Sequence, residues 1–273
     1  MQKTKTIFKA IALFAIITAL FIALVTLSIP KNKYALLINY QEPSNSQDKK
    51  TLNVLKKENI NELVVDTIND LFIMPEPLSL NYGGEEGPEY DAENNQILIP
   101  YSFIQEVEKR FSKAKYADSG VSINDATMDA VMHTILHELA HALINIYELP
   151  IVVKEEDAAD ALATLLLIEF FEDGREIAIS AADLFDLESD DIKDFEEADF
   201  WDEHSLDVQR YYNTLCSVYG SAPKEYAALV EDADFSDEKA EGCIDDYEQL
   251  YFSWMTLLKP YLKNSPPSLS KNN

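Results

Sequence analysis

The sequence predicts an α+β protein with one small antiparallel sheet, a mainly helical C-terminal half, and one transmembrane helix before the folded domain. Three observations lead to this prediction. An uncharged run from Ala10 to Ile29 lies near the N-terminus, two short apolar runs follow within residues 78–101, and helical spacing of apolar residues dominates the rest. A chain of 273 residues, 47% of them hydrophobic, can also bury a sizeable core.

The N-terminal run is typical of a membrane-spanning helix. Lysines precede it, and its twenty residues at about 1.5 Å each span the hydrocarbon core of a bilayer. A cleaved signal peptide is the alternative, but an A-x-A-like cleavage site is missing. The lysines favour a cytoplasmic N-terminus. We therefore expect a signal anchor over 1–30, with the remainder exported to the periplasmic or extracytoplasmic side, or secretion after cleavage.

Turn formers and apolar spacing divide the first part of the exported chain. Residues 31–50 are polar and turn-rich, which indicates a linker, although the stretch 34–40 within it could form a strand. Apolar residues return at helical spacing over 49–71, which predicts one amphipathic helix. The runs 78–82 and 96–101 then alternate and are separated by a segment rich in turn formers, so we expect two strands.

Helices are expected from there to the C-terminus. Asn124 or Asp125 is the expected N-cap of the longest one, and Gly174 should end the next. Ser102 is a plausible N-cap of the first, and the acid-rich stretch 183–203 is expected to be a solvated loop with helical turns. The predicted helices cover residues 102–115, 122–150, 155–174, 205–219 and 238–262.

Charge and cysteine content restrict partners and compartment. With 49 acidic and 22 basic residues the formal charge is −27, which repels the phosphates of nucleic acids and argues against their binding. The two cysteines, Cys216 and Cys243, fall in the part predicted to be exported, where a disulfide is favoured over two buried free thiols. We expect one domain over 51–263 and a disordered tail over 264–273.

The sequence HELAH, within the longest predicted helix, has the spacing of a metal site. Residues four apart lie on one face of a helix, so His137 and His141 can bind a single ion with Glu138 beside it. Zinc brings the pKa of a bound water towards about 7, and a neighbouring carboxylate can accept its proton. We therefore expect Zn²⁺ as the cofactor and Glu138 as the general base. Two structural histidines are the alternative.

A catalytic zinc needs a third protein ligand, and the next predicted helix offers candidates. Glu156 and Asp160 lie four residues apart near its start. One carboxylate could bind the metal while the other holds the second ring nitrogen of a ligating histidine. From spacing alone the choice between the two stays open, and Asp160 as the direct ligand remains an alternative. The neighbouring Glu155 and Asp157 are expected to stabilise the helix N-terminus through the helix dipole.

HExxH followed by this ExxxD spacing resembles the gluzincins, the thermolysin-like group of metallopeptidases. The wider segments "HELAHALINIYELP", "KEEDAADALA" and "WDEHSLDVQRYYNTLCSVYG" are similar to a bacterial family of zinc metallopeptidases of unknown physiological role, over about residues 75–262. The resemblance implies a zincin-like domain and peptide or protein substrates. It also implies that Glu156 is the third ligand and that Asp160 supports His137.

The resemblance extends to the histidine of "WDEHSLD". It implies that His204 stabilises the oxyanion of the transition state, with Asp202 or Asp207 as an orienting acid. The run "QILIPY" could form a sheet edge on which an extended peptide adds as a strand, or it could be an ordinary core strand. Together these features predict a membrane-anchored zinc metallopeptidase. Its rivals are a non-catalytic zinc-stabilised scaffold or partner-binding protein and a metal-free acidic interaction domain.

Overall fold

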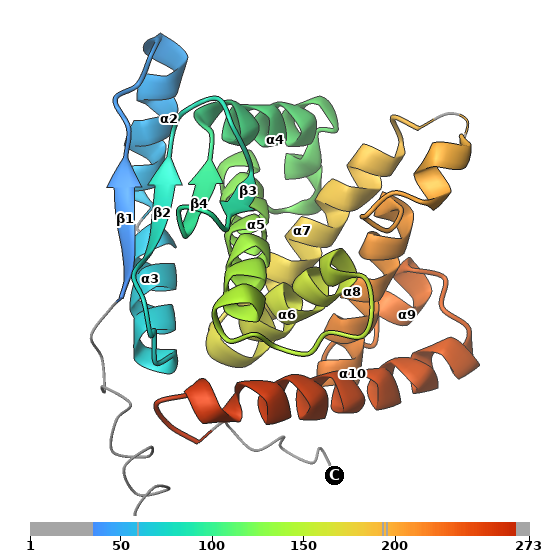
Figure 1. Ribbon diagram of the computed structural model, residues 1–273. Coiled ribbons are helices and arrows are strands. Elements are labelled where there is room, and N and C mark those ends of the chain that lie inside the picture. The colour runs from blue at the N-terminus through green and yellow to red at the C-terminus, as the bar shows by residue number, and fades with distance from the viewer. Residues whose placement is uncertain (1–34, 59, 193, 195, 266–273) are drawn as a thin grey trace, which may run out of the picture.

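Four short strands form one sheet beside a larger group of helices (Figure 1). The computed structural model describes residues 35–58, 60–192, 194 and 196–265. The strands are β1 (Leu36–Tyr40), β2 (Leu78–Tyr82), β3 (Glu89–Asp91) and β4 (Gln96–Ile99). The helices are α2 (Ser46–Lys57), α3 (Ile60–Leu71), α4 (Tyr101–Lys113), α5 (Ile123–Ile146), α6 (Glu155–Phe170), α7 (Gly174–Ser189), α8 (Asp207–Ser221), α9 (Leu229–Asp232) and α10 (Asp237–Leu258), with short 3₁₀ turns η1 (Tyr116–Ser119), η2 (Glu197–Phe200) and η3 (Lys259–Tyr261).

The sheet is mixed, so the predicted antiparallel arrangement is wrong. Its order is β1-β2-β4-β3, with β1 and β4 both parallel to β2 and only β3 antiparallel to its neighbour β4. Between β3 and β4 the Asp91 carboxylate accepts hydrogen bonds from the backbone N–H groups of Glu93 and Asn94, which closes a tight hairpin. Through this hairpin β3 pairs with one edge of β4, and β2 pairs with the other edge.

Strand β1 falls within the range predicted as a linker. Leu36 is fully buried, and Asn69 of α3 hydrogen-bonds to both its N–H and its carbonyl oxygen. Those bonds satisfy backbone groups at the edge of the sheet. The folded unit therefore includes residues before 51.

The single helix predicted over 49–71 is two helices, α2 and α3. Leu55 and Val64 are both fully buried and nine residues apart. At about 100° per residue, a continuous helix would direct these two side chains about 180° from one another. A break after Lys57 lets both reach the core, where α2 packs on α4 and α3 packs on β1 and α5.

The transmembrane helix predicted over 1–30 lies outside the described residues, and so does the tail from residue 266 onwards. Among the helices that the structure does describe, none is both long enough and apolar enough to cross a bilayer. The predicted fold class is therefore corrected to an α+β domain with a small mixed sheet and mainly helical content.

Helix α5 lies at the centre of the fold and positions the candidate site (Figure 1). It packs against α4, α6, α7 and the strands β3 and β4, which explains why most of its 24 residues are buried. The predicted N-caps were Asn124 or Asp125, but the cap is Ser122, whose hydroxyl oxygen accepts a hydrogen bond from the N–H of Asp125 at 3.1 Å.

The boundary between α6 and α7 differs from the prediction. Helix α6 ends at Phe170, and Gly174 begins α7 instead of ending α6. A Cβ atom at Gly174 would lie 1.8 Å from the carbonyl oxygen of Leu167, so only glycine allows this close return of the chain. Of the solvated loop with helical turns predicted over 183–203, the first residues continue α7, where acids find partners such as Asp183 with Tyr116, and η2 is a helical turn.

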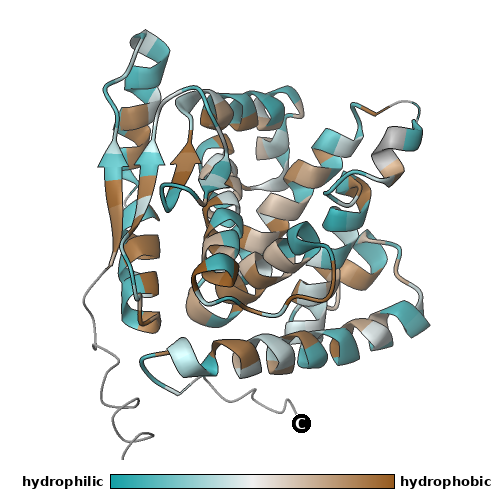
Figure 2. Cartoon of the chain, viewed as in Figure 1, coloured by the Kyte–Doolittle hydropathy of each residue, from teal (hydrophilic) through white to brown (hydrophobic). Residues whose placement is uncertain are grey.

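Helices α8 and α10 match the last two predicted helices and are joined by the predicted disulfide between Cys216 and Cys243, with an S–S distance of 2.01 Å. Hydrophobic and hydrophilic residues alternate along α10, as expected for a helix with one buried face (Figure 2). A Cβ atom at Gly220 would lie 2.1 Å from the carbonyl oxygen of Cys243. A larger residue there would separate α8 from α10.

Loss of this disulfide should destabilise the domain. Its two cysteines are separated by 27 residues. Closing a loop of this length lowers the conformational entropy of the unfolded chain, which stabilises the folded state by about 3–4 kcal/mol. Cys216→Ala/Cys243→Ala is therefore expected to lower the free energy of unfolding in urea by about this amount. A reducing agent should lower the unfolding midpoint of the native protein and leave that of the double variant unchanged. Equal midpoints for native protein and variant without reductant would contradict the expectation.

Candidate metal centre

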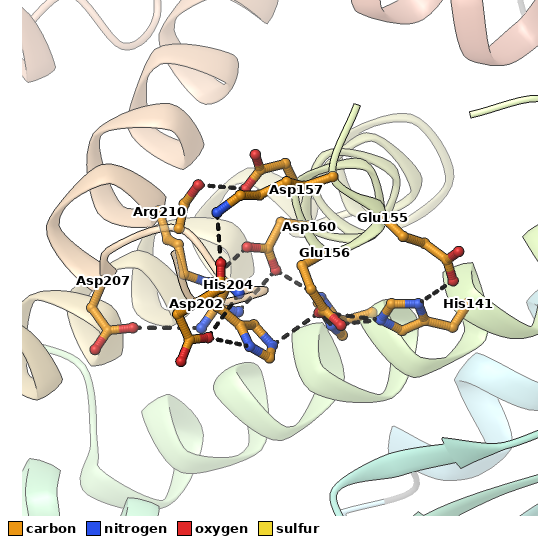
Figure 3. A network of polar contacts seen from close by, with 12 residues as sticks. His141, Glu155, Glu156, Asp157, Asp160, Asp202, His204, Asp207 and Arg210 are labelled. Carbon is orange, nitrogen blue, oxygen red and sulfur yellow. Dashed lines mark hydrogen bonds and ion pairs between the residues drawn. The ribbon is translucent and has the colours of Figure 1, made fainter. Parts of the chain in front are cut away.

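Two helices and one loop bring four side chains together (Figure 3). His137 and His141 lie on α5, and Glu156 lies in the first turn of α6, which packs against α5. His204 reaches the same place from the segment between η2 and α8. The short α5–α6 connection therefore positions the two histidines of the HELAH sequence opposite the glutamate.

The oxygen Oε2 of Glu156 lies among three imidazole nitrogens. It is 3.1 Å from Nε2 of His137, 3.3 Å from Nε2 of His141 and 2.9 Å from Nε2 of His204. The Nε2 atoms of His137 and His141 are themselves 3.1 Å apart. His137, Glu156 and His204 each offer one ligand atom within 4.8 Å of the others. The predicted ligands thus lie together. His204 was expected to stabilise an oxyanion, but it is also close enough to Glu156 to offer a ligand atom.

The outer ring nitrogens of the two α5 histidines contact carboxylates. Nδ1 of His137 lies 2.7 Å from Oδ1 of Asp160, and Nδ1 of His141 lies 2.9 Å from Oε1 of Glu155. An Nδ1–H group that donates to a carboxylate leaves the Nε2 lone pair free for a metal, as is usual for metal-binding histidines. The side chains therefore fit a divalent cation. Glu155, expected only at the helix N-terminus, also orients His141.

Arg210 holds Asp160 in place, although no sequence motif indicated it. Its Nε and Nη2 atoms donate to the two carboxylate oxygens of Asp160 at 2.7 and 2.9 Å (Figure 3). The guanidinium also lies 3.9 Å from the ring centre of Phe185 on α7. Arg210 is fifty residues from Asp160 along the chain, so spacing could not pair them. The sequence held one clue to its role. Arg210 is the only arginine or lysine in the segment "WDEHSLDVQRYY", which contains three acidic residues.

The network perturbs the acid–base behaviour of the metal-free site. Burial lowers the pKa of His137, but its hydrogen bonds with Asp160 and Glu156 outweigh burial and raise that pKa to about 9. Burial raises the pKa of the Glu156 carboxyl, but hydrogen bonds with three histidines bring it far below its ordinary value. A metal ion needs the Nε2 lone pair of His137, so it must compete there with a proton that the raised pKa favours. Metal affinity should consequently fall as pH decreases.

Glu138 lies beside this group, in a cleft of about 690 Å³. Glu138 is 7% exposed. Burial raises the pKa of its carboxyl, while the nearby His137 and His141 oppose that rise. The cleft is bounded by β3, α5, the start of α6 and the segment around His204. A buried carboxyl at the floor of an accessible cleft can exchange protons with a bound molecule.

The sheet edge that faces this cleft is β3. Of the two alternatives for "QILIPY", a sheet edge or a core strand, the second is confirmed, because β4 lies between β2 and β3. Glu89 and Tyr90 of β3 line the cleft instead. Strand β3 has only three residues and lies among turn formers, so it shows no strand pattern in the sequence. In the part of the chain that the structure describes, no other strand pairs with its outer edge, and the backbone of Tyr90 hydrogen-bonds the Glu138 carboxyl there.

His204 is the most exposed member of the group, with 46% of its side chain accessible. Its backbone N–H donates to Oδ1 of Asp202 at 3.0 Å, and its Nδ1 lies 3.7 Å from the same oxygen. Asp207, the other candidate orienting acid, instead lies 3.6 Å from Arg210. The hydrogen bond with Glu156 raises the pKa of His204 above its ordinary value.

Loss of the Asp160 carboxylate should weaken metal binding. Asp160→Asn keeps the size of the side chain but loses the charge that pairs with His137 and Arg210, so metal affinity is expected to fall about 10–100-fold. Competition with a chromophoric chelator measures this change. Asp157→Asn is the matched control, because Asp157 lies on the same helix turn but bonds Ser205 and contacts no histidine. Unchanged affinity in Asp160→Asn would contradict the expected role.

Comparisons with known proteins agree with this geometry. A family model, DUF4344, whose description reads "Putative metallopeptidase", matches residues 40–258. No match was found among curated proteins or among solved structures. The match covers every element from α2 to α10, and the family implies a metal and peptide or protein substrates. With this match and with metal-ligand side chains converging in its cleft, the chain belongs to the DUF4344 metallopeptidase family.

Proposed function

We propose that this protein is a zinc-dependent peptidase of the gluzincin type, with His137, His141 and Glu156 as the metal ligands. The observation that supports this proposal is the convergence of imidazole Nε2 atoms on the Glu156 carboxylate. Two histidines and one carboxylate form a donor set that suits catalytic zinc and leaves a position for water. Both α5 histidines have a carboxylate at Nδ1, which favours metal binding over simple burial.

Glu138 is the proposed general base. A bound zinc ion supplies Lewis-acid polarisation and lowers the pKa of water. Glu138 accepts the proton of the attacking water and then delivers it to the amine of the leaving peptide. Burial raises the pKa of its carboxyl, and a raised pKa suits a group that must both accept and donate a proton.

The edge of β3 and His204 are proposed to position the substrate. An extended peptide can pair with the outer edge of β3 through main-chain hydrogen bonds, beside the Tyr90 backbone group that bonds Glu138, which places its carbonyl groups along the cleft. His204, whose pKa is raised by Glu156, can donate a hydrogen bond to the oxyanion that develops on the attacked carbonyl. The disulfide fits a protein that works in an oxidising, extracytoplasmic compartment.

Metal removal and return test the proposed function. Treatment with a strong chelator should abolish hydrolysis of an unstructured protein such as denatured casein, and about one equivalent of Zn²⁺ should restore it. Magnesium is the control, because it prefers oxygen ligands and should not restore activity. Hydrolysis that persists after complete metal removal would contradict the proposal. A protein that binds zinc without hydrolysing any peptide would be the non-catalytic scaffold instead.

A further inference from the structure

The cleft around the metal centre is unusually acidic. Six of its fourteen lining residues are glutamates, and none is lysine or arginine. In the whole chain, 49 of 273 residues are acidic and 22 are basic, so the cleft exceeds the general acidity of the protein. Lys154 directly precedes the lining residue Glu155, but its Nζ donates to the backbone carbonyl of Asp202, and it does not line the cleft.

Two of these glutamates belong to the proposed catalytic group. Glu156 lies among the histidines and Glu138 is the proposed base. A divalent cation would contribute two positive charges, which these two carboxylates balance. The other four glutamates are therefore left as an excess of negative charge: Glu89, Glu148, Glu155 and Glu203.

The four glutamates surround the site from different elements. Glu89 lies on β3, Glu148 follows the end of α5, Glu155 begins α6, and Glu203 precedes α8. All four are exposed to solvent. Only Glu155 contacts a histidine, through Nδ1 of His141. Negative charge therefore enters the lining of the cleft from four separate segments, one of which is β3.

We propose that the preferred substrates are polypeptides with lysine or arginine side chains close to the scissile bond. This inference rests on the proposed peptidase function and adds its substrate class. Carboxylates that line a cleft raise the local concentration of cationic ligands and increase their association rate. An acidic peptide would be repelled by the same groups. Main-chain pairing with β3 would supply affinity, and the glutamates would select the charge of the side chains.

Matched peptides test this preference. Internally quenched peptides of one length, with the central residues flanked by lysine, glutamine or glutamate, are cleaved by the metal-loaded full chain. The lysine series should have a kcat/KM about tenfold above the glutamine series, and the glutamate series should be slowest. Raising the salt from about 20 mM to about 500 mM should reduce the difference, because salt screens exposed charges.

Variants locate the effect in the cleft. Glu148→Gln changes neither the proposed ligands nor the base, and Glu148 lies outside β3, so cleavage of the glutamine peptides should stay unchanged. It should lower the advantage of the lysine peptides about threefold. Glu241→Gln is the matched control, because it removes the same charge from the exposed face of α10, outside the cleft. Binding of fluorescent lysine and glutamine peptides to metal-loaded Glu138→Gln gives the same comparison without turnover.

The outcomes separate this inference from the proposed function. Cleavage of the glutamine peptides at the same rate as the lysine peptides would overturn the charge preference and leave the peptidase function standing. An equal loss of preference in Glu241→Gln would overturn the assignment to the cleft. If the metal-loaded protein cleaved no peptide of any series, both the proposed function and its substrate class would be wrong.

Discussion

Glu138→Gln is expected to lower kcat/KM for peptide hydrolysis about 1,000-fold while the protein keeps its metal. Glutamine has nearly the same size as glutamate, but it cannot accept a proton from water. Glu138 is not among the side chains that converge on Glu156, so the variant should leave the ligand group intact. Steady-state hydrolysis of a quenched peptide measures the rate, and elemental analysis of the same sample measures the bound metal.

Two results would contradict this expectation. Activity within about tenfold of the native protein would mean that another group accepts the proton. Loss of metal together with activity would mean that Glu138 supports the metal site and not the chemistry. Glu241→Gln again serves as the control, because it removes a carboxylate that is remote from the cleft.

His204→Ala is expected to lower kcat about 100-fold with little change in metal content. His204 lies 2.9 Å from Glu156, so its position alone is compatible with a metal ligand. Its side chain is 46% exposed on an irregular segment, whereas His137 and His141 lie on the rigid helix α5. A catalytic zinc also keeps one position open, which four protein ligands would close.

His141→Ala provides the comparison that separates the two roles. It should lose zinc during dialysis against a weak chelator, because it removes a proposed ligand, while His204→Ala should retain zinc under the same conditions. If His204→Ala lost zinc and His141→Ala kept it, the ligand set would be His137, Glu156 and His204. The oxyanion role of His204 would then be wrong.

Local sequence patterns predicted the helices better than the sheet. Helix α5 and the cysteine-bearing helices α8 and α10 follow from apolar spacing, because each buries one face or more against its neighbours. The sheet topology depends on β3, whose three residues give no periodic signal. The break between α2 and α3 could have been found, because Leu55 and Val64 cannot face one core from a continuous helix.

The site was predicted where its residues share a helix or begin the next one. His137 and His141 are paired by the helical period, and a short connection places Glu156 and Asp160 within reach of His137. Arg210 could not be paired with Asp160, because contacts between distant segments depend on how α8 packs against α6. The closeness of His204 to Glu156 has the same origin, a segment placed by tertiary packing.

The most direct test of zinc-dependent peptidase activity combines zinc content and hydrolysis in one preparation of the purified protein. We expect about one zinc per chain and cleavage of unstructured peptides by the native protein, with zinc but almost no cleavage in Glu138→Gln. Zinc without cleavage of a broad peptide library would contradict the peptidase function. A protein that binds no zinc at neutral pH, even when zinc is supplied, would contradict the metal centre itself.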